Sequence, residues 1–548
     1  MAFNPEPSAA HWQTLLSLAL TGKTERCATE PTTLDDGTIY DTVMRSLSPL
    51  QLSAGSILDP RIVPPYLEVE LDNADDVIRT TSDTYEFGGK AATLQLGQEN
   101  AAASFETVFS GTVRFPGSIS YWDDRVLRIE LEDARTKDAK VLPINRFDPA
   151  TYANMETKSY YLSVPLLYGD WRTTAGGGEV VPAYQIDSTE GTGGRFKVCD
   201  HAIPAIEAVY LNGVSKAFTA ATGDLDIGEF VLDVAYAPAT DTCTVNCQGA
   251  TNDGLRTGTR LDTLPAIYND ILQTHLSVSA VNIDATAIAT WEAALNTTDY
   301  GRRWIGTEVN SDDLLRDLLV EGWADPVVSG GKYTPVYRQV LTTGAEPNFA
   351  GSEIRSRPDG QKAFSIRKDP DRTYANEVVG DYRYDPIAGS YLVTYAKQRV
   401  DAILAIGTTK RRRLQFNWLY LAGGAERRVN REVFVFSNEL EILDVTFDPN
   451  GMLLEPTDQF RLLYSKYEIS SGLGTPFQVR SISKDFSSMT ARVSAWNMNN
   501  TAPGQWTSAS ANAWSAATAW EKQTQGFWCD ASGRASPGDP TSSRSVFW

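Results

Sequence analysis

The sequence predicts a mainly β protein of several domains: two regions of antiparallel β-barrel or sandwich, an inserted β domain and a small helical segment. Three observations lead to this fold class. The chain has 548 residues, more than one hydrophobic core usually supports. Short apolar–polar alternations bounded by turn residues recur near both ends. Between them, the spacing of apolar residues changes to that of a helix.

The first 60 residues carry one helical signal and one hairpin signal. Trp12–Leu20 predicts a short helix, which Thr21 and Gly22 end. The Asp35–Gly37 stretch predicts a hairpin turn, since an Asp-Gly pair favours the turn types that join two strands.

The stretch 66–134 shows the period of two most clearly. In Tyr66–Leu71 every second residue is apolar, so one face of the strand is predicted to be buried and the other solvated. Further predicted strands are Phe105–Phe109 and Thr112–Phe115 around a turn at Ser110 and Gly111, and Arg125–Leu131 after a turn at Asp123 and Asp124.

Residues 135–260 read as an inserted β domain with long Gly- and Thr-rich loops. Its predicted strands are Lys158–Leu167, Ala205–Leu211 and Phe230–Tyr236, and Asn212 with Gly213 predicts a hairpin turn. The next segment, 261–335, is predicted to be helical.

Three helices are expected in that helical segment. Apolar residues share one face over Leu264–His275, and Ala285–Leu295 forms a second helix. Asn310 and Ser311 offer an N-cap for a third helix over Asp312–Glu321, whose first turn carries two acidic residues. His275, alone on an apolar face, is interpreted as a core residue.

Strands return over 336–496. Leu414, Phe416, Trp418 and Tyr420 alternate with other residues and predict a strand with a buried aromatic face. Leu440–Phe447, the run around Phe460, Phe477–Ile482 and Met489–Trp496 then predict a compact antiparallel unit.

The net charge of −20, from 69 acidic and 49 basic residues, argues against general nucleic-acid binding, which needs a cationic face. One cationic island stands out, Lys410–Arg413. It is interpreted first as a solvated hairpin turn. The alternative is a patch of Arg411, Arg412 and Arg413 that docks on an acidic partner subunit.

No enzyme motif or cofactor site is predicted. The chain lacks the HExxH, Walker A and GxSxG patterns. Cys199, His201, Cys243 and Cys247 could be assembled into a metal site, but their spacing matches no common zinc pattern, so buried thiols are expected instead.

The tail, 497–548, is rich in Ser, Ala, Thr and Gly and carries five tryptophans. Tryptophans suit an interface, so the tail is predicted to contact a partner, with packing on its own chain as the alternative. The candidate contact residues are Trp506, Trp514, Trp520, Trp528 and Trp548.

The order of these segments resembles the tail-hub proteins of long-tailed bacteriophages. The resemblance covers 60–134, 262–330 and 439–496. It rests on "LEVELDNADDVIR" at 67–79, "FETVFSGTV" at 105–113, "WDDRVLRIELEDA" at 122–134, "SDDLLRDLLVEGWADPV" in the helical segment and "FQVRSISKDF" near the end.

The resemblance implies two tail-tube-like barrels and a structural virion protein without cofactors. The expected units are 1–134 with the first hub barrel, 135–260, 261–335, 336–496 with the second hub barrel, and the tail 497–548. The family implies a homotrimer in the tail tip or baseplate. It would link the tail tube or a distal ring protein above to tip or fibre proteins below, and form part of the DNA exit channel.

Two alternatives remain open from the sequence. One is another tail-tip component, such as a distal ring protein, although those usually have a single barrel. The other is a secreted β-protein that binds or cleaves carbohydrate. The sequence shows neither a secretory signal nor an apolar run long enough to span a membrane. We therefore expect the protein to be made in the host cytoplasm.

The charge also leads to an expectation for the channel. DNA carries one negative charge per ~1.7 Å of axis, so an acidic bore would repel it weakly and let it pass. Glu68, Glu70, Glu130 and Glu132, on the polar faces of two predicted strands, are the candidates for lining it. The alternative is that the acidic residues only keep a large assembly soluble.

Overall fold

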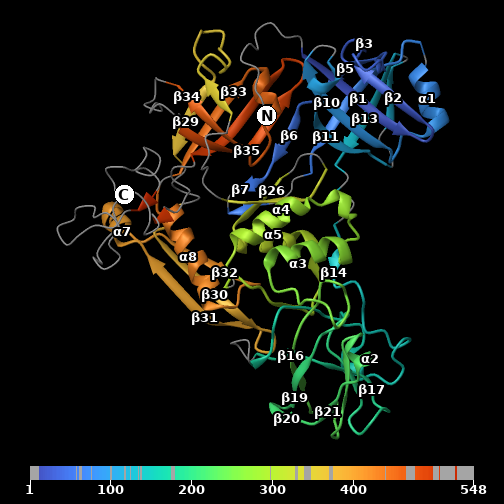
Figure 1. Ribbon diagram of the computed structural model, residues 1–548, viewed down its shortest axis with the longest axis vertical. Helices are drawn as coiled ribbons and strands as arrows, with labels where there is room; N and C mark the ends of the chain where they lie inside the picture. Colours follow the sequence, from blue (N-terminus) through green and yellow to red (C-terminus); the bar gives the residue numbers. More distant parts are fainter. Residues whose placement is uncertain are drawn as a thin grey trace.

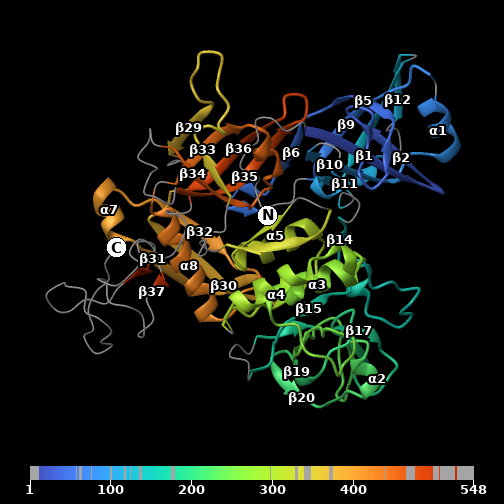
Figure 2. The same cartoon turned by 45° about the horizontal axis from the view of Figure 1, so that its top comes forward.

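The computed structural model confirms a mainly β protein with a closed seven-stranded barrel and a half-barrel. Figures 1 and 2 show these two units side by side, with the helical segment beneath them and the inserted β domain at the far end. The structure describes 12–497, 505–506 and 525–526, except for 57, 61–63, 76, 99–100, 116–118, 124, 134, 136–138, 174–178, 297, 328–330, 339–346, 369–373, 439 and 465–474.

The closed barrel is formed by the N-terminal strands in the order β11-β10-β1-β2-β5-β9-β13, and β11 then pairs with β13 to close it. All neighbours are antiparallel except β2 and β5. Its elements are β1 (Trp12–Leu20), β2 (Lys23–Ala28), β5 (Thr42–Leu47), β9 (Tyr66–Asp72), α1 (Val77–Tyr85), β10 (Ala91–Gln98), β11 (Glu106–Val113) and β13 (Val126–Glu132), with β12 (Ile119–Asp123) beside β13.

The predicted helix at Trp12–Leu20 is wrong, because this segment is the barrel strand β1. Leu16 and Leu18 point into the main core, while Leu15 is buried on the opposite face beneath Tyr40. A strand buried on both faces carries apolar residues at adjacent positions, and that spacing imitates a helix. Thr21 and Gly22 form the turn of the β1–β2 hairpin rather than a helix end.

The turn predicted at Ser110 and Gly111 is also wrong, because both residues lie within β11. Gly111 is needed there for closure of the barrel. A Cβ at this position would lie 2.2 Å from the backbone oxygen of Glu132, on the partner strand β13. Glycine therefore permits the close backbone approach at the seam where β11 meets β13.

The half-barrel has the strand order β28-β34-β35-β36-β33-β29, and β6 pairs with β35. Strand β6 follows β5 after two residues, so the chain passes directly from the closed barrel into the half-barrel. One cluster of contacting apolar side chains runs through both units. The strands are β6 (Leu50–Ser53), β28 (Asn348–Ala350), β29 (Phe364–Lys368), β33 (Glu441–Phe447), β34 (Gln459–Leu463), β35 (Thr475–Asp485) and β36 (Thr490–Asn497).

The inserted domain contains two four-stranded sheets, β16-β23-β19-β20 and β17-β18-β22-β21, around their own core. The turn at Asn212 and Gly213 is confirmed, since both have positive φ between β19 and β20. The elements are β16 (Val181–Pro182), β17 (Tyr184–Asp187), β18 (Arg195–Lys197), β19 (Ile206–Leu211), β20 (Val214–Lys216), β21 (Phe218–Thr219), α2 (Thr222–Leu225), β22 (Glu229–Leu232) and β23 (Cys243–Cys247).

Two strands predicted in this domain are shorter than expected. Lys158–Leu167 is mostly irregular, and β15 begins only at Leu166. Its chain turns at Tyr161, which has φ 64 and therefore cannot continue a strand. The strand predicted over Phe230–Tyr236 ends at Leu232 as part of β22.

The helical segment contains α3 (Leu264–Asp270), α4 (Ala285–Ala294) and α5 (Ser311–Glu321). The Asn310 side chain accepts the Asp312 N–H, which confirms the predicted N-cap. His275 is half-buried, with its Nε2 atom 3.8 Å from Asp270. Short strands surround these helices: β14 (Val141–Leu142), β15 (Leu166–Tyr168), β24 (Arg303–Ile305), β25 (Val309–Asn310), β26 (Ala324–Val327) and β27 (Thr334–Tyr337).

The strands of 336–496 divide between two sheets. Besides the half-barrel, this region forms a separate sheet in the order β31-β30-β32, with α8 on one face. The core of this unit is continuous with that of the helical segment. Its elements are β30 (Glu377–Asp385), β31 (Ser390–Gln398), α7 (Val400–Ile406), β32 (Arg411–Gln415) and α8 (Ala422–Phe436).

The strands not yet described before Asn497 are four short ones of two residues each. β3 (Thr32–Thr33) pairs with β4 (Ile39–Tyr40), which confirms the hairpin turn predicted at Asp35–Gly37, and β7 (Gly55–Ser56) pairs with β8 (Asp59–Pro60).

Candidate partner interface

The cationic island Lys410–Arg413 does not form a turn, so that prediction is wrong. Arg411–Gln415 is the edge strand β32, which runs parallel to β30. Successive side chains of a strand point to opposite faces. Arg411 and Arg413 therefore lie on the open face of the sheet, whereas Arg412 points toward α8.

The two outward arginines are paired with acidic residues of β30. Arg411 binds Glu377 and Arg413 binds Asp381, with Nη2–oxygen distances of 3.2 and 3.1 Å. These contacts lower the pKa of both carboxyl groups. The arginine side chains are 67% exposed and the acidic side chains at most 4%. The open face thus presents guanidinium groups whose charge is balanced from beneath.

Arg412 belongs to the interior rather than to the surface. Its Nη1 atom lies 3.1 Å from Glu432 of α8, and its guanidinium carbon lies 4.4 Å from the centre of the Phe436 ring. Arg428 pairs with the same Glu432 and lies over Trp323, at 4.1 Å. Arg412 therefore fastens the sheet to α8.

The predicted tryptophan contacts fall largely outside the described residues. Trp506 lies in β37 (Gln505–Trp506), which pairs in parallel with β38 (Gln525–Gly526). The positions outside the described residues are Trp514, Trp520, Trp528 and Trp548.

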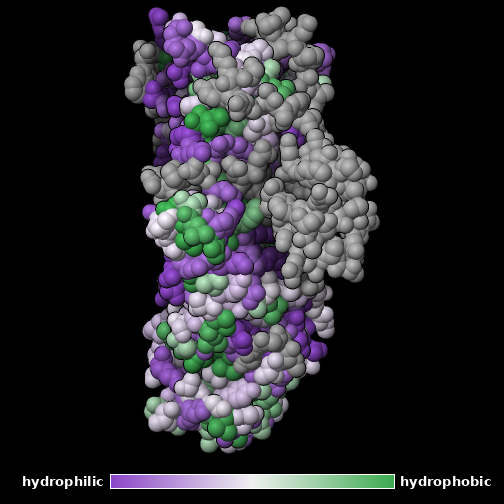
Figure 3. Space-filling model, turned by 90° about the vertical axis from the view of Figure 1, so that its left-hand side faces the viewer, coloured by the Kyte–Doolittle hydropathy of each residue, from purple (hydrophilic) through white to green (hydrophobic). Residues whose placement is uncertain are grey.

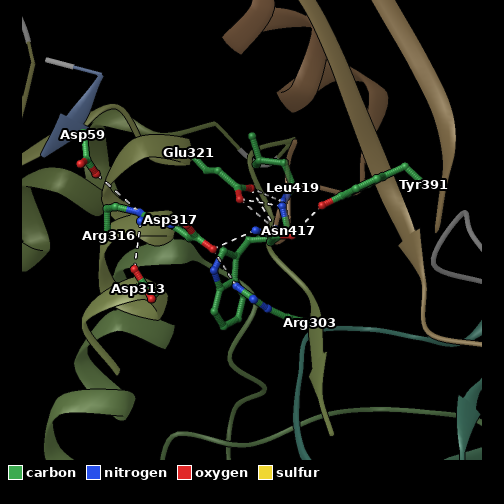
Figure 4. A network of polar contacts seen from close by, with 10 residues as sticks. Asp59, Arg303, Asp313, Arg316, Asp317, Glu321, Tyr391, Asn417 and Leu419 are labelled. Carbon is green, nitrogen blue, oxygen red and sulfur yellow. Dashed lines mark hydrogen bonds and ion pairs between the residues drawn. The ribbon is translucent and has the colours of Figure 1, made fainter. Parts of the chain in front are cut away.

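A buried carboxyl group holds the sheet unit to the helical segment (Figure 4). Glu321, at the end of α5, accepts the backbone N–H groups of Asn417, Trp418 and Leu419 at 2.7, 3.0 and 2.8 Å. These amides have no strand partner, which is why the strand predicted over 414–420 ends at Gln415. Burial raises the pKa of Glu321 to about 8.

The network continues through the Asn417 side chain. Its amide donates to Asp317 of α5 at 2.8 Å, and its oxygen accepts the Tyr391 hydroxyl of β31 at 2.6 Å. Arg316 joins Asp317 to Asp59 of β8, which lies on the barrel side of the molecule. One chain of polar contacts therefore runs from the outer sheet through α5 to the β7–β8 hairpin.

A second buried carboxylate joins the inserted domain to the same sheet. Glu179 binds Arg302, which precedes β24, and Arg383 of β30. Burial opposes its ionisation, but the two arginines outweigh that effect and lower its pKa. Arg302 also lies between the rings of Trp171 and Tyr420, at 4.5 and 4.3 Å. Arg383 has φ 64, a conformation that costs energy in a non-glycine residue.

A third such contact joins β26 to the half-barrel. Asp325 is completely buried and receives Arg338 Nε at 2.9 Å and Nη2 at 2.7 Å. Arg480 of β35 approaches it to 2.7 Å and donates to the Gly55 carbonyl at 3.1 Å. Burial would raise the pKa of Asp325, but the two arginines lower it below its ordinary value.

The closed barrel is fastened in the same way. Arg135 pairs with Asp133 at the end of β13 and donates to the carbonyls of Val327 and Lys332 at 3.1 and 2.9 Å. Val327 ends β26 and Lys332 lies shortly before β27, so both carbonyls lie near the loop that joins these strands. A buried arginine with several acceptors in a fixed fork fixes orientation as well as distance. We call the four acidic residues at the centre of these contacts the junction carboxylates: Asp133, Glu179, Glu321 and Asp325.

The polar face of the barrel differs from the bare acidic surface expected. Arg128 of β13 binds Glu68 at 2.5 Å and Glu70 at 2.8 Å across the β9–β13 pair. Arg114 binds Glu130 at 2.8 Å. Three of the four candidate channel glutamates, Glu68, Glu70 and Glu130, are thus paired with arginines that share their face.

The four cysteines in the described part of the chain are buried, and the two histidines there are partly buried. Cys27, Cys199, Cys243 and Cys247 are free thiols, and burial raises the pKa of Cys243 to about 12. His201 accepts the Leu167 N–H at 3.0 Å. Within the described part of the chain, no group of three or more His, Cys, Asp or Glu could hold a metal ion, and no helix is long and apolar enough to cross a membrane.

Comparisons with known proteins find tail components among solved structures. No family model and no curated protein matches the chain. A 43 kDa tail protein of prophage MuSo2 from Shewanella oneidensis is 12% identical, over 89% of this chain and 99% of that one, with a TM-score of 0.38. A chain of a native gene transfer agent virion is 13% identical, over 65% and 87%, with a TM-score of 0.41.

A component of the Escherichia coli type VI secretion system, c3393, is 8% identical to this chain. The match covers 87% of this chain and 81% of that one, with a TM-score of 0.32. The structural neighbours of the chain are therefore phage tail proteins, gene transfer agent components and type VI secretion proteins.

Proposed function

We propose that this chain is a structural virion protein, the central hub of a phage tail tip or baseplate. The observation that carries the proposal is where the segments that resemble tail hubs lie. Residues 67–72, 106–113 and 126–132 form β9, β11 and β13, the strands around the seam of the closed barrel. Residues 441–497 supply four strands of the half-barrel.

The junction carboxylates support a load-carrying, non-enzymatic role. Each ties units distant in sequence through buried contacts. Removing Asp133, Glu179 or Asp325 leaves a buried arginine without its counter-charge, and removing Glu321 leaves three buried amides without an acceptor. Such contacts resist relative motion of the units. A hub needs that stiffness, because it transmits force between the tail tube and the tip.

The open face of β30, β31 and β32 is our candidate for contact with a neighbouring subunit. It presents Arg411 and Arg413, which can rearrange from their own acidic partners to an acidic surface. In the proposed assembly, three copies surround the tail axis. Tube or distal ring proteins lie above them, and tip or fibre proteins below.

The polar face of β9 and β13 is our candidate for the wall of the DNA exit channel. A cationic wall would retain DNA through its phosphates. A wall where Arg128 is held between Glu68 and Glu70 offers DNA no unpaired guanidinium and little net attraction. We infer a passage that DNA crosses without binding.

The mass of the purified protein in solution tests the proposal. We expect a trimer, three times the 60.1 kDa of the chain, by light scattering coupled to size exclusion. The expected mass follows from the closed ring that a hub must form. A monomer with affinity for polysaccharides would contradict the proposal and favour the carbohydrate-binding alternative.

A further inference from the structure

Helix α7 exposes much of its apolar surface. The helix, Val400–Ile406, contains six apolar residues and one charge, and none of its residues is buried. Val400, Leu404 and Ile406 are 62%, 77% and 45% exposed. Figure 3 shows a hydrophobic patch at the height at which Figure 1 places this helix.

Such a helix needs a cover. A helix of seven residues is too short to be stable by itself in water, and most helices gain their stability by packing an apolar face. Val400, Leu404 and Ile406 therefore lack the packing partner that such a helix needs among the described residues. Contiguous exposed apolar surface marks a site at which another segment or molecule packs.

Strand β36 ends near the N-terminal end of α7. Asn497, the last residue of β36, donates to Glu441 at 2.7 Å. Shortly before Glu441, Ser437 and Asn438 accept hydrogen bonds from Arg399 at 3.0 and 3.2 Å. Arg399 is the N-cap residue of α7. Asn497, the last described residue before the tail, therefore lies near the N-terminal end of the helix.

The composition of 498–548 fits this surface. It contains five of the 13 tryptophans of the chain and few charged residues. An extended chain spans ~3.3 Å per residue, so every part of the segment can reach α7. Tethering also gives an effective concentration on the order of millimolar, which favours the same chain over a separate partner.

We propose that the tail 498–548 of the same chain packs its tryptophans on α7. Aromatic side chains bury large areas against aliphatic ones and would cover Val400, Leu404 and Ile406 together. The tail would then be a covering segment of this chain, whatever the chain's role in the virion. The inference is independent of the proposed function.

Crosslinking in the full chain tests the proposal. The tail carries its own thiol, Cys529, next to Trp528, whereas the four other cysteines are buried. We introduce Leu404→Cys and treat the protein with a short bismaleimide. The matched control is Val214→Cys, which changes a residue that is 58% exposed in β20, at the opposite end of the molecule.

We expect the crosslink from position 404 to Cys529 to exceed that from position 214 by at least tenfold, by peptide mass spectrometry. In a mixture of isotopically light and heavy protein, it should join peptides of the same label. Equal yields from the two positions would overturn the proposal. A crosslink that mainly joins light to heavy chains would also overturn it, because the tail of a neighbouring copy would then be the occupant.

A second variant tests how well the tail is protected from protease. Leu404→Asp places a charge in the proposed contact and should speed tryptic cleavage at Lys522 at least tenfold relative to the unaltered protein. Val214→Asp should leave that rate unchanged. If Leu404→Asp leaves cleavage at Lys522 as slow as in the unaltered protein, or if cleavage there is equally fast in all three proteins, the tail does not pack on α7.

Discussion

Replacing Asp325 with alanine is expected to lower the free energy of unfolding by about 3–5 kcal/mol, the range for breaking a buried ion pair. The substitution leaves the guanidinium groups of Arg338 and Arg480 buried without their counter-charge. It also releases β26 from the half-barrel. Chemical denaturation monitored by tryptophan fluorescence gives the measurement.

The control is Asp444→Ala, which removes the partly exposed partner of the exposed Arg367. Surface ion pairs contribute about 0–1 kcal/mol, so this variant should unfold almost like the unaltered protein. Equal losses for the two variants would show that the Asp325 contact does not hold the units together.

Replacing Glu321 with alanine is expected to cost about 3–5 kcal/mol, since three buried amides lose their acceptor and each unpaired amide costs about 1–3 kcal/mol. Glu321→Gln retains one carbonyl acceptor and should cost less. Thermal unfolding of both variants shows which of the two is less stable. An alanine variant as stable as the glutamine variant would contradict the role of residue 321 as the acceptor for these amides.

Glu321 also predicts a pH dependence. Its pKa is about 8 in the folded protein and near the ordinary value of 4.5 in the unfolded chain. Between these values the folded state binds the extra proton, so its contribution to stability is present below pH 4.5 and is lost as the pH rises to about 8. Relative to the unaltered protein, Glu321→Gln should therefore gain stability from pH 5 to pH 8.5. A constant difference would contradict the raised pKa.

Local sequence patterns predict those elements whose hydrogen bonds are local. The Asn310 cap, the turn at Asn212 and Gly213 and the alternating strand β9 are all as expected. In each case, the residues that decide the conformation lie within one turn or one strand of each other. The same reasoning fails at Trp12–Leu20, because burial of both strand faces depends on distant segments.

The junction carboxylates could not be predicted for the same reason. Glu179 and Arg383 are 204 positions apart, and Arg135 lies 197 positions from Lys332. No local spacing connects such residues in a chain with 69 acidic side chains. The cationic island is evident in the sequence. That two of its arginines face outward and one faces α8 follows only from the strand that they form.

A reconstruction of the tail end of the intact virion measures where the chain lies. We expect three copies of this chain around the tail axis, with the closed barrels and half-barrels forming the ring next to the tube and the inserted domains farther out. Density for this chain away from the axis, or its absence from purified virions, would contradict the account.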